Sequence, residues 1–414
     1  MRRIYTLICT LFLINNLYSQ QLATFARTDK KWMLINLEQE KIFNHEFDFI
    51  YSPQFEYFAQ PNIKSIIHLP SGNYFKIHVS GRYGYLDRNG NFLFPPINNK
   101  IGDLKNGHAI LEEKIGFNYI NKDGKRITDK RLLNANDFSN NYALVQYKST
   151  WYFMDSIGRF LSSKGYKKAN SFEKGFARVK EKSGWGVINT KGEYIIEPKY
   201  QHLNEISENT MAFLEYGFWG FINIKEDTIS NAKFDRIRNF KNGMAAVKER
   251  RKWGFINKNG ELIVECKYDK IRDFSEGFAV LFEDDVIEIV DTIGKIIGSY
   301  NYDDIRKCKE GALRFQKDDL WGFLKNDGSL IIDPKYWDSE DFSEGYARVM
   351  ENYKWFFLNK EGINEFNMYF DEAKDFHKGF ARIKIGEKWG LINTNGEFVI
   401  QPRYRNISNV FTIE

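Results

Sequence analysis

The sequence has 414 residues and a formal charge of +5, with 60 Lys and Arg residues against 55 Asp and Glu residues. A nucleic-acid-binding protein needs a concentrated basic face, so this near balance argues against such a function. Aromatic residues make up 16% of the chain and only 8 residues are Pro, which is typical of a strand-rich, packed protein and excludes a disordered one.

The first twenty residues have the three-part layout of a secretory signal peptide. Residues 1–3 are a short basic start, residues 4–14 form an apolar run, and residues 15–20 are polar. The apolar run is too short to cross a bilayer as an ordinary helix. Removal of residues 1–20 on export takes away two arginines and no acidic residue, which lowers the formal charge from +5 to +3. No later stretch is apolar enough to span a membrane, so we expect no transmembrane segment in the mature chain.

From residue 32 onward the sequence repeats itself around one marker position, usually Trp. The marker falls at Trp32, Tyr83, Phe117, Trp151, Trp185, Trp219, Trp253, Ile287, Trp321, Trp355 and Trp389. Every step is 34 residues except the first, which is 51, so an insertion is expected at about 51–69, where prolines interrupt the pattern. Trp337 is the only one of the 9 Trp residues outside this register. A fixed internal period indicates a repeat array that grows by the addition of units.

The residues after each marker predict a buried strand and a hairpin. In the copy Trp253-Gly254-Phe255-Ile256-Asn257, as in the others, the two residues after the Gly position are apolar. Neighbouring side chains in a strand point to opposite faces, so this strand must be covered on both faces, and the adjacent repeats are the natural covers. Asn257 and the Gly three residues later favour a type I turn closed by a Gly at positive φ, with a return strand after it.

A second turn is marked by Gly277 and its equivalents in the other repeats. Two copies have Asn141 and Asn209 instead, and Asn is the residue other than Gly that best tolerates left-handed backbone. The choice of Gly or Asn at this position is therefore expected to depend on the backbone angle and not on contact with a ligand. The next strand carries a small residue, as at Ala279, and an apolar residue two positions later. This alternation predicts interlocking with the large side chains of a neighbouring repeat.

Each unit thus holds three or four short antiparallel strands. The fold is predicted to be all-β, a tandem array of about eleven 34-residue antiparallel β-sheet repeats over residues 21–414. Two architectures stack such sheets face to face: an open superhelical stack and a closed β-propeller-like ring. Eleven units exceed the roughly four to eight blades that are usual for a propeller, and 34 residues are few for a four-stranded blade. The open superhelical stack is therefore favoured, with the ring as the alternative.

At this point the motifs are familiar. The segments KWGFIN at 252–257 and FSEGYARV at 342–349 resemble the repeats of bacterial WG-repeat (KWG-repeat) proteins, and the resemblance covers essentially all of residues 22–414. The chain departs from the pattern at Ile287, which has neither the Trp nor the following Gly, and at the insertion. The resemblance implies the repeat fold. It implies no particular chemistry, because the family is largely without assigned activity.

The sequence carries no recognisable catalytic, cofactor-binding or metal-binding motif, so no residue is assigned to any of these roles. The 6 His residues lack zinc-ligand spacing, no Gly-x-Ser-x-Gly elbow or phosphate-binding loop is present, and the acidic clusters lack calcium-loop spacing. Cys308 occupies a position that is Phe in other repeats and is expected to be a small core residue. Cys266 occupies a position that is Pro in other repeats, and a disulfide between the two cysteines is left open.

One row of side chains is a candidate interaction surface. In the strand after the second turn, the aromatic residue before the Ala and the Arg after it point away from the face to which the Ala belongs. Aromatic and Arg side chains are favoured in protein interfaces and also stack on sugars. The residues concerned are Phe176, Arg178, Phe278, Arg314, Tyr346, Arg348, Phe380 and Arg382. The alternative is that the rings are core contacts to the adjacent repeat and the Arg side chains cover its rim.

Together these observations predict an exported, non-catalytic repeat protein that acts as a binding or scaffolding module. Its partner would be a protein or a surface glycan, with no cofactor and no nucleic acid, and its location would be the periplasm, the outer surface or the medium of a bacterium. One alternative is a propeller-like glycan hydrolase that gathers carboxylates from several repeats. Another is a structural spacer of the cell envelope, which predicts no saturable ligand.

Overall fold

The computed structural model describes residues 21–28, 31–38, 41, 46–51, 65–68, 74–87, 90–98 and 100–413. The elements in these ranges are β-strands, which confirms the all-β prediction. The chain divides into two compact units, one of residues 1–114, 119–126 and 371–414 and one of residues 115–118 and 127–370. The expected signal peptide and most of the expected insertion lie outside the described residues. No helix long and apolar enough to cross a membrane occurs among the described residues.

The first unit holds strands from both ends of the chain. They are β1 (Gln21–Arg27), β2 (Trp32–Asn36), β3 (Phe49–Tyr51), β4 (Ser65–His68), β5 (Tyr74–Val79), β6 (Arg82–Asp87), β7 (Phe92–Asn98), β8 (His108–Glu113), β36 (Glu372–Ala373), β37 (Phe380–Ile385), β38 (Lys388–Asn393), β39 (Phe398–Tyr404), β40 (Asn406–Ile407) and β41 (Phe411–Ile413). β9 (Gly116–Asn121) has residues in both units. β3 and β4, at the edges of the expected insertion, pair in parallel.

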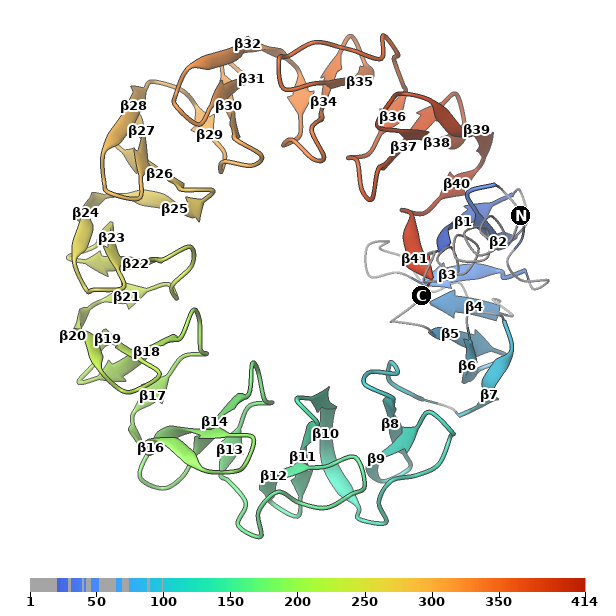
Figure 1. Cartoon of the computed structure of the whole chain (residues 1–414), viewed down its shortest axis with the longest axis vertical. Coiled ribbons are helices and arrows are strands. Elements are labelled where there is room, and N and C mark those ends of the chain that lie inside the picture. The colour runs from blue at the N-terminus through green and yellow to red at the C-terminus, as the bar shows by residue number, and fades with distance from the viewer. Residues whose placement is uncertain are drawn as a thin grey trace, which may run out of the picture. The chain divides into compact units, whose positions relative to one another are not determined.

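The second unit holds the remaining strands, and its sheets follow one another in chain order (Figure 1). They are β10 (Leu132–Ser139), β11 (Tyr142–Tyr147), β12 (Thr150–Met154), β13 (Lys168–Ala169), β14 (Phe176–Lys180), β15 (Trp185–Asn189), β16 (Tyr194–Tyr200), β17 (His202–Leu203), β18 (Thr210–Glu215), β19 (Phe218–Asn223), β20 (Thr228–Phe234), β21 (Arg236–Ile237), β22 (Met244–Glu249), β23 (Lys252–Asn257), β24 (Leu262–Tyr268), β25 (Lys270–Ser275), β26 (Phe278–Glu283), β27 (Val286–Asp291), β28 (Ile296–Tyr300), β29 (Asp304–Ile305), β30 (Ala312–Lys317), β31 (Leu320–Lys325), β32 (Leu330–Tyr336), β33 (Asp338–Ser339), β34 (Ala347–Glu351) and β35 (Lys354–Leu358).

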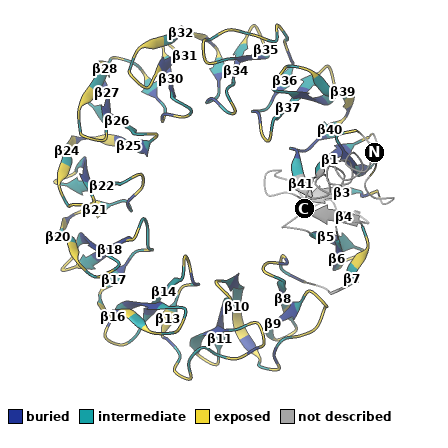
Figure 2. Ribbon diagram, in the orientation of Figure 1, coloured by how far each residue is buried: buried dark blue, intermediate teal, exposed yellow. Residues whose placement is uncertain are grey.

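The sheet β21-β22-β23-β24 shows how one repeat is built. The marker Trp253 lies in β23 and pairs with Tyr268 of the return strand β24. Gly254, Phe255 and Ile256 of β23 are all buried, so this strand packs on both faces, as the two apolar residues predict. Burial is concentrated in the middle strands of the sheets, whereas the return strands carry exposed residues (Figure 2). The core cluster at this sheet joins it to the next one, since Phe255 and Val264 pack together with Phe274 and Ala279 of the following repeat.

The Gly that follows the marker makes room for a bulge in the return strand. A Cβ on Gly254 would lie 2.3 Å from the Val264 carbonyl oxygen and 2.9 Å from the Cys266 nitrogen, because the register of β24 shifts opposite it. The same crowding and shift occur at Gly84, Gly186, Gly220, Gly322 and Gly390. Where the residue is Glu288, the return strand β28 pairs without this shift, and where it is Phe356, the sheet β33-β34-β35 has no return strand. The bulge and the Gly therefore occur together.

Both predicted turns are confirmed. In the first, Gly260 has a φ of 82° and donates its N–H to the Asn257 carbonyl, while the Asn257 side-chain oxygen accepts from the N–H of Asn259 and Glu261. In the second, Gly277 has a φ of 88°, and the Asn equivalents, Asn141 and Asn209, have φ values of 69° and 62°. A Cβ on Gly277 would meet nothing within 4 Å, so backbone angle alone explains this Gly.

Successive second turns are tied to one another by carboxylates. Glu276 accepts hydrogen bonds from the N–H of Glu310 and Gly311, both at 2.8 Å. Glu310 accepts in the same way from Glu344 and Gly345, at 2.6 and 2.8 Å. Two consecutive N–H groups in left-handed backbone form a concave anion site, and here the preceding repeat fills it.

The first and last strands of the described chain share one sheet. Arg27 and Ala26 of β1 pair with β40, and Ala23 pairs with β41. The buried side chains of Thr24 and Ser408 lie 3.1 Å apart in a hydrogen bond. β40 takes the place that β36 has in the preceding sheet, so the C-terminal segment supplies the strand that the first repeat lacks.

This end-to-end pairing corrects one expectation. The array of all-β repeats is confirmed, but the preference for an open superhelical stack is wrong in that its ends would stay apart. Joined ends belong to the closed alternative. The physical reason is that β1 and β40 each have a strand edge with free backbone N–H and C=O groups, and pairing the two strands satisfies both edges.

The two described cysteines are free thiols. Cys308 is buried in the core cluster with Ile305 and Phe315, which confirms its role as a small core residue. Burial, followed by the charge of Glu276, raises the pKa of the Cys308 thiol to about 12, which makes it a poor nucleophile. Cys266 is half-buried beside the Val247 carbonyl.

Candidate functional site

Arg side chains cover the marker Trp in several repeats of the second unit. The Arg348 guanidinium lies 4.7 Å from the ring centre of Trp355, and Arg238 lies 5.0 Å from that of Trp253. These Arg residues stand seven or fifteen positions before the Trp. A guanidinium over an indole face is attractive and fills the space between two sheets.

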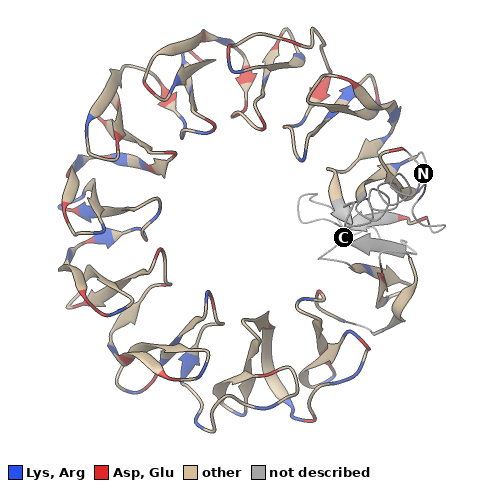
Figure 3. Ribbon diagram, in the orientation of Figure 1, with Lys and Arg blue, Asp and Glu red and all other residues tan. Residues whose placement is uncertain are grey.

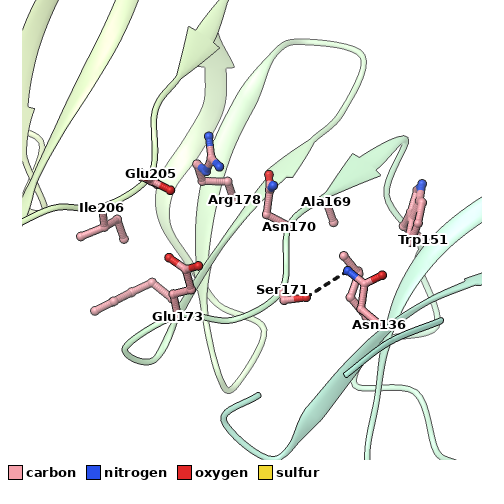
Figure 4. Close-up of a pocket in the computed structure, with 11 residues that line it drawn as sticks. Asn136, Trp151, Ala169, Asn170, Ser171, Glu173, Arg178, Glu205 and Ile206 are labelled. Carbon is pink, nitrogen blue, oxygen red and sulfur yellow. Dashed lines mark hydrogen bonds between the residues drawn. The ribbon is translucent and has the colours of Figure 1, made fainter. Parts of the chain in front are cut away.

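At Trp151 both of these positions lack Arg, since they hold Leu144 and Asn136. A cavity of about 290 Å³ lies beside this Trp. It is lined by Asn136, Leu144, Trp151, Ala169, Asn170, Ser171, Glu173, Phe176, Arg178, Glu205 and Ile206 (Figure 4). We call it the Trp151 cleft. Trp219 also lacks Arg at both positions, but the ring of His202 packs 5.6 Å from it.

Loops and strand ends from three consecutive repeats position the polar groups of the cleft. The Asn136 amide, on β10, donates a hydrogen bond of 3.2 Å to the Ser171 hydroxyl of the next repeat (Figure 4). Arg178, on β14, donates 2.7 Å to the Leu203 carbonyl of the repeat after that. Glu173 stands at the start of a two-residue turn whose far end is Phe176, and their backbones exchange hydrogen bonds of 2.8 and 3.0 Å. The hairpin thus holds the acid and the aromatic ring together.

The charge of the cleft is mixed. Burial lowers the pKa of the Arg178 guanidinium, and the carboxylates of Glu205 and Glu173 oppose this shift by stabilising its charged form. Two carboxylates and one guanidinium therefore share the cleft with the amides of Asn136 and Asn170. Among the described residues, no group of three His, Cys, Asp or Glu side chains is placed to hold a metal ion.

The predicted aromatic and Arg row does not form one continuous site. Phe176 and Arg178 line the Trp151 cleft. Arg314 and Arg348 meet at Glu340, at 3.5 and 3.2 Å, and Arg314 also approaches Asp341 at 3.3 Å. Their guanidinium groups are thus engaged by carboxylates of the protein.

The remaining members of the row are spread over other repeats. Phe278 packs against the core cluster of Ile289 and Phe315. Tyr346 packs on Phe366 at 4.8 Å. In the first unit, Phe380 packs against a core cluster, and Arg382 donates 3.0 Å to the Ile407 carbonyl. Burial lowers the pKa of Arg382 to about 10. A role of the whole row as a surface stays a prediction.

Most of the cleft residues escaped sequence reasoning. Asn136, Asn170, Ser171, Glu173 and Glu205 are ordinary polar residues in a chain that is rich in them. One feature of the sequence does mark the cleft. The two positions that carry Arg in other repeats, seven and fifteen residues before the marker Trp, carry neither Arg nor Lys in the repeat of Trp151. Such a gap has meaning only when the two positions are known to lie beside the same ring.

Lys and Arg are interspersed with Asp and Glu along the sheets of the second unit (Figure 3). The absence of a nucleic-acid partner stays a prediction, with this mixture as its support.

A family described as "WG containing repeat" matches ten segments of the sequence. They are residues 83–113, 119–151, 153–184, 185–217, 219–253, 253–285, 289–321, 321–355, 357–389 and 389–411. No curated protein matches the sequence at a significant level.

Several solved structures have a remote likeness to the chain. A eukaryotic initiation factor aligns with a TM-score of 0.38 and 12% identity, over 76% of this chain and 95% of its own. Hsv2 of Kluyveromyces lactis aligns with a TM-score of 0.28 and 12% identity, over 61% of this chain and 94% of its own. PorZ, a surface component of the type-IX secretion system of Porphyromonas gingivalis, aligns with a TM-score of 0.24 and 10% identity, over 91% of this chain and 64% of its own. Likenesses this remote carry no argument about function.

Proposed function

The chain belongs to the family of proteins built from WG-containing repeats, and on this premise we propose that it is a non-catalytic binding module. Its ligand is a saccharide unit of a surface glycan, held in the Trp151 cleft. One observation carries the proposal: this cleft gathers hydrogen-bond donors, acceptors and aromatic rings from three consecutive repeats. Binding sites are concave and combine apolar walls with a few convergent polar groups.

The chemistry of the lining suits a polyol. A sugar hydroxyl both donates and accepts, so its site needs carboxylate or carbonyl oxygens together with N–H groups. Glu173 and Glu205 supply acceptors, Arg178 supplies donors, and the amides of Asn136 and Asn170 supply both. Trp151 and Phe176 supply rings for the apolar C–H face of a sugar. The mixed charge favours a neutral or zwitterionic sugar over a strongly anionic one.

The hydrolase alternative also has some support, because two carboxylic acids, Glu173 and Glu205, line the same cleft. A glycosidase needs one carboxylic acid that stays protonated and a second carboxylate on the opposite side of the scissile bond. Glu173 and Glu205 both interact electrostatically with the Arg178 guanidinium in the cleft, so the lining itself accounts for them as partners of a cation. Binding without cleavage is therefore the better-supported function.

Export is part of the proposal, and the signal-peptide layout of residues 1–20 supports it. When the full chain is expressed in a bacterium, the exported protein should begin near Gln20 or Gln21. N-terminal sequencing of material recovered outside the cytoplasm checks this, and an intact Met1 on that material would contradict export by a cleaved signal.

Binding is tested by screening the mature protein on a microarray of bacterial envelope oligosaccharides and titrating the best ligand by calorimetry. Asn136→Arg should weaken binding at least tenfold, because the new guanidinium fills the cleft as Arg238 fills the space over Trp253. The variant should stay folded, since other repeats carry Arg at this position. Glu361→Gln, which neutralises an exposed turn residue outside the cleft, is the matched control and should bind normally.

Each other outcome has a definite meaning. No saturable binding to any glycan would contradict the proposal and favour the spacer or a protein partner. Release of smaller sugars, abolished by Glu173→Gln and by Glu205→Gln, would establish the hydrolase. Binding that Asn136→Arg leaves intact would place the ligand elsewhere on the chain.

A further inference from the structure

One repeat of the second unit departs from the pattern at several aromatic positions at once. Trp337 occupies a position that holds Leu133, Lys167, Gln201, Asp235, Asp269 or Asp303 in the preceding repeats of that unit. Tyr353 stands in the β34–β35 turn, where the corresponding residue of the preceding repeat is Asp319. Phe356 replaces the Gly after the marker. These residues and Tyr369 are close in the sequence of this repeat, and we refer to them together as the 337–369 aromatic cluster.

In the preceding repeat, the Asp at the position of Trp337 accepts a hydrogen bond from a turn. Asp303 accepts a 2.7 Å hydrogen bond from the N–H of Asp318, in the turn fifteen residues later. Trp337 cannot accept that bond from Asn352. Its ring instead packs edge-to-face on Tyr353, with ring centres 4.8 Å apart. An aromatic pair has thus replaced a polar contact at the same place, and the pair faces solvent.

The exposure of this pair is high. Trp337 is 43% exposed and Tyr353 is 78% exposed. Tyr353 also has a left-handed backbone, with a φ of 61°, which bulky residues disfavour. Tyr216 also combines left-handed backbone with high exposure, so these two properties alone do not mark a binding site. Tyr353 differs from it in packing on a second exposed ring, Trp337, and a role in recognition explains this exposed pair.

Phe356 extends the cluster. Its ring is buried at the position where a Gly, such as Gly254, faces the bulge of a return strand in other repeats, and this sheet has no return strand. Tyr369 packs on Phe356 with ring centres 5.3 Å apart and is itself 55% exposed. The loss of the strand therefore leaves a second aromatic ring at the surface of the same repeat.

We propose that the 337–369 aromatic cluster is a stacking platform for a neutral β-linked polysaccharide. Pyranose rings joined in this way form an extended chain with flat C–H faces, which pack on exposed Trp and Tyr rings while the hydroxyl groups stay in water. The surroundings fit this occupant, because Tyr353 is flanked by the exposed polar residues Glu351, Asn352 and Lys354. A protein hot spot would lie within a desolvated apolar patch instead. The inference rests on the proposed function only for the class of ligand and uses none of the cleft residues.

The test is affinity electrophoresis of the mature chain in native gels that contain hydroxyethyl cellulose or glycol chitin. The wild type should be retarded by at least one polymer. The double variant Trp337→Asp/Tyr353→Asp restores the residues of the preceding repeat, Asp303 and Asp319, so it should fold normally. It should raise the dissociation constant at least about tenfold. Tyr353→Phe should bind like the wild type.

A matched control is available in the hairpin of β18 and β19. Tyr216 is 90% exposed in a turn and has no Trp partner at the equivalent of Trp337, where Gln201 stands. Tyr216→Asp should leave retardation unchanged. If it removes retardation equally, exposed Tyr residues bind non-specifically and the platform is overturned.

The remaining outcomes separate this inference from the proposed function. Retardation lost in the double variant and kept in Asn136→Arg supports the platform, whatever the cleft does. Retardation lost only in Asn136→Arg overturns the platform and supports the cleft. A wild type that neither polymer retards also overturns the platform, and the microarray result then decides the cleft alone.

Discussion

The sheet of β21–β24 and the sheet of β33–β35 are built on the same repeat motif, but only the first has a return strand. In the first, Gly254 lets the return strand β24 bulge toward the backbone of β23. In the second, Phe356 stands at the same position, and the ring occupies space that the bulge would need. The comparison shows that a Gly at this position lets the return strand bulge toward the marker strand, whereas Glu288, which has a Cβ, keeps a return strand that pairs without this shift.

The two sheets also differ in what they expose. The complete sheet ends on a paired return strand that exposes Leu262, Glu265 and Lys267 and no aromatic ring, whereas the sheet without a return strand leaves Tyr369 at the surface beside Phe356. A repeat array can therefore gain a distinct surface without changing its period. Substitutions at Phe356, Gly254, Gly277 and Glu276 test these differences, and they are given in order of decreasing expected effect.

The largest effect is expected for Phe356→Gly. The ring is buried between Tyr336 and Tyr369, and deleting it leaves a cavity that no return strand fills. Unfolding free energy should fall by about 4 kcal/mol. Chemical denaturation measures this, with Tyr353→Ala as the control for loss of an exposed ring. A stability equal to the wild type would mean that the segment after β35 can form the missing strand.

The reverse exchange, Gly254→Phe, should cost about 3 kcal/mol, because the new Cβ meets the Val264 carbonyl at 2.3 Å. Hydrogen exchange should show lost protection in β24 and little change in β21. Glu288→Phe, at the equivalent position with a regular return strand, should cost less. Equal costs at the two positions would refute the link between this Gly and the bulge.

A third prediction concerns Gly277, where the backbone angle and not crowding requires a Gly. Gly277→Val should destabilise the protein by about 1–2 kcal/mol more than Gly277→Asn, because a β-branched residue resists a φ near 88° and Asn tolerates it. Space plays no part here, since a Cβ would meet nothing within 4 Å. Identical denaturation midpoints for the two variants would disprove the backbone account.

The smallest effect concerns Glu276. Burial raises the pKa of its carboxyl, but the hydrogen bonds from Gly311, Glu310 and Cys308 outweigh burial and hold the pKa below its usual value of 4.5. A carboxyl whose pKa is lowered on folding stabilises the native state above its unfolded pKa, and this contribution is lost as the pH falls through the folded pKa.

Glu276→Gln should therefore cost about 1 kcal/mol at pH 7, after allowance for solvent screening, and nearly nothing well below pH 4.5. Denaturation midpoints at pH 7 and pH 3 measure the difference. A cost that stays constant with pH would show that the carboxylate charge is not involved.

Much of the local structure could be predicted. The 34-residue period, the apolar pairs such as Phe255 and Ile256, and the turn residues Asn257 and Gly277 each follow from strand alternation or backbone angle. The candidate site was less accessible. Phe176 and Arg178, which were predicted as part of an interaction surface, line the cleft, and Asn136 and Glu205 reach it from the neighbouring repeats. Their convergence depends on how consecutive sheets pack, which no local pattern encodes.

The repeat, its strands and its turns follow from local sequence, because they depend on side-chain alternation and on φ within a few residues. The contacts between repeats depend on the tertiary structure. It pairs β1 with β40 across nearly the whole chain, places Glu276 on the next turn, and brings Trp337 onto Tyr353. The reason is physical. From local sequence one can recognise a strand edge, a backbone N–H group that needs an acceptor, or an aromatic ring at the surface, but not the group that it contacts. Which partner it finds depends on the packing of the sheets in space.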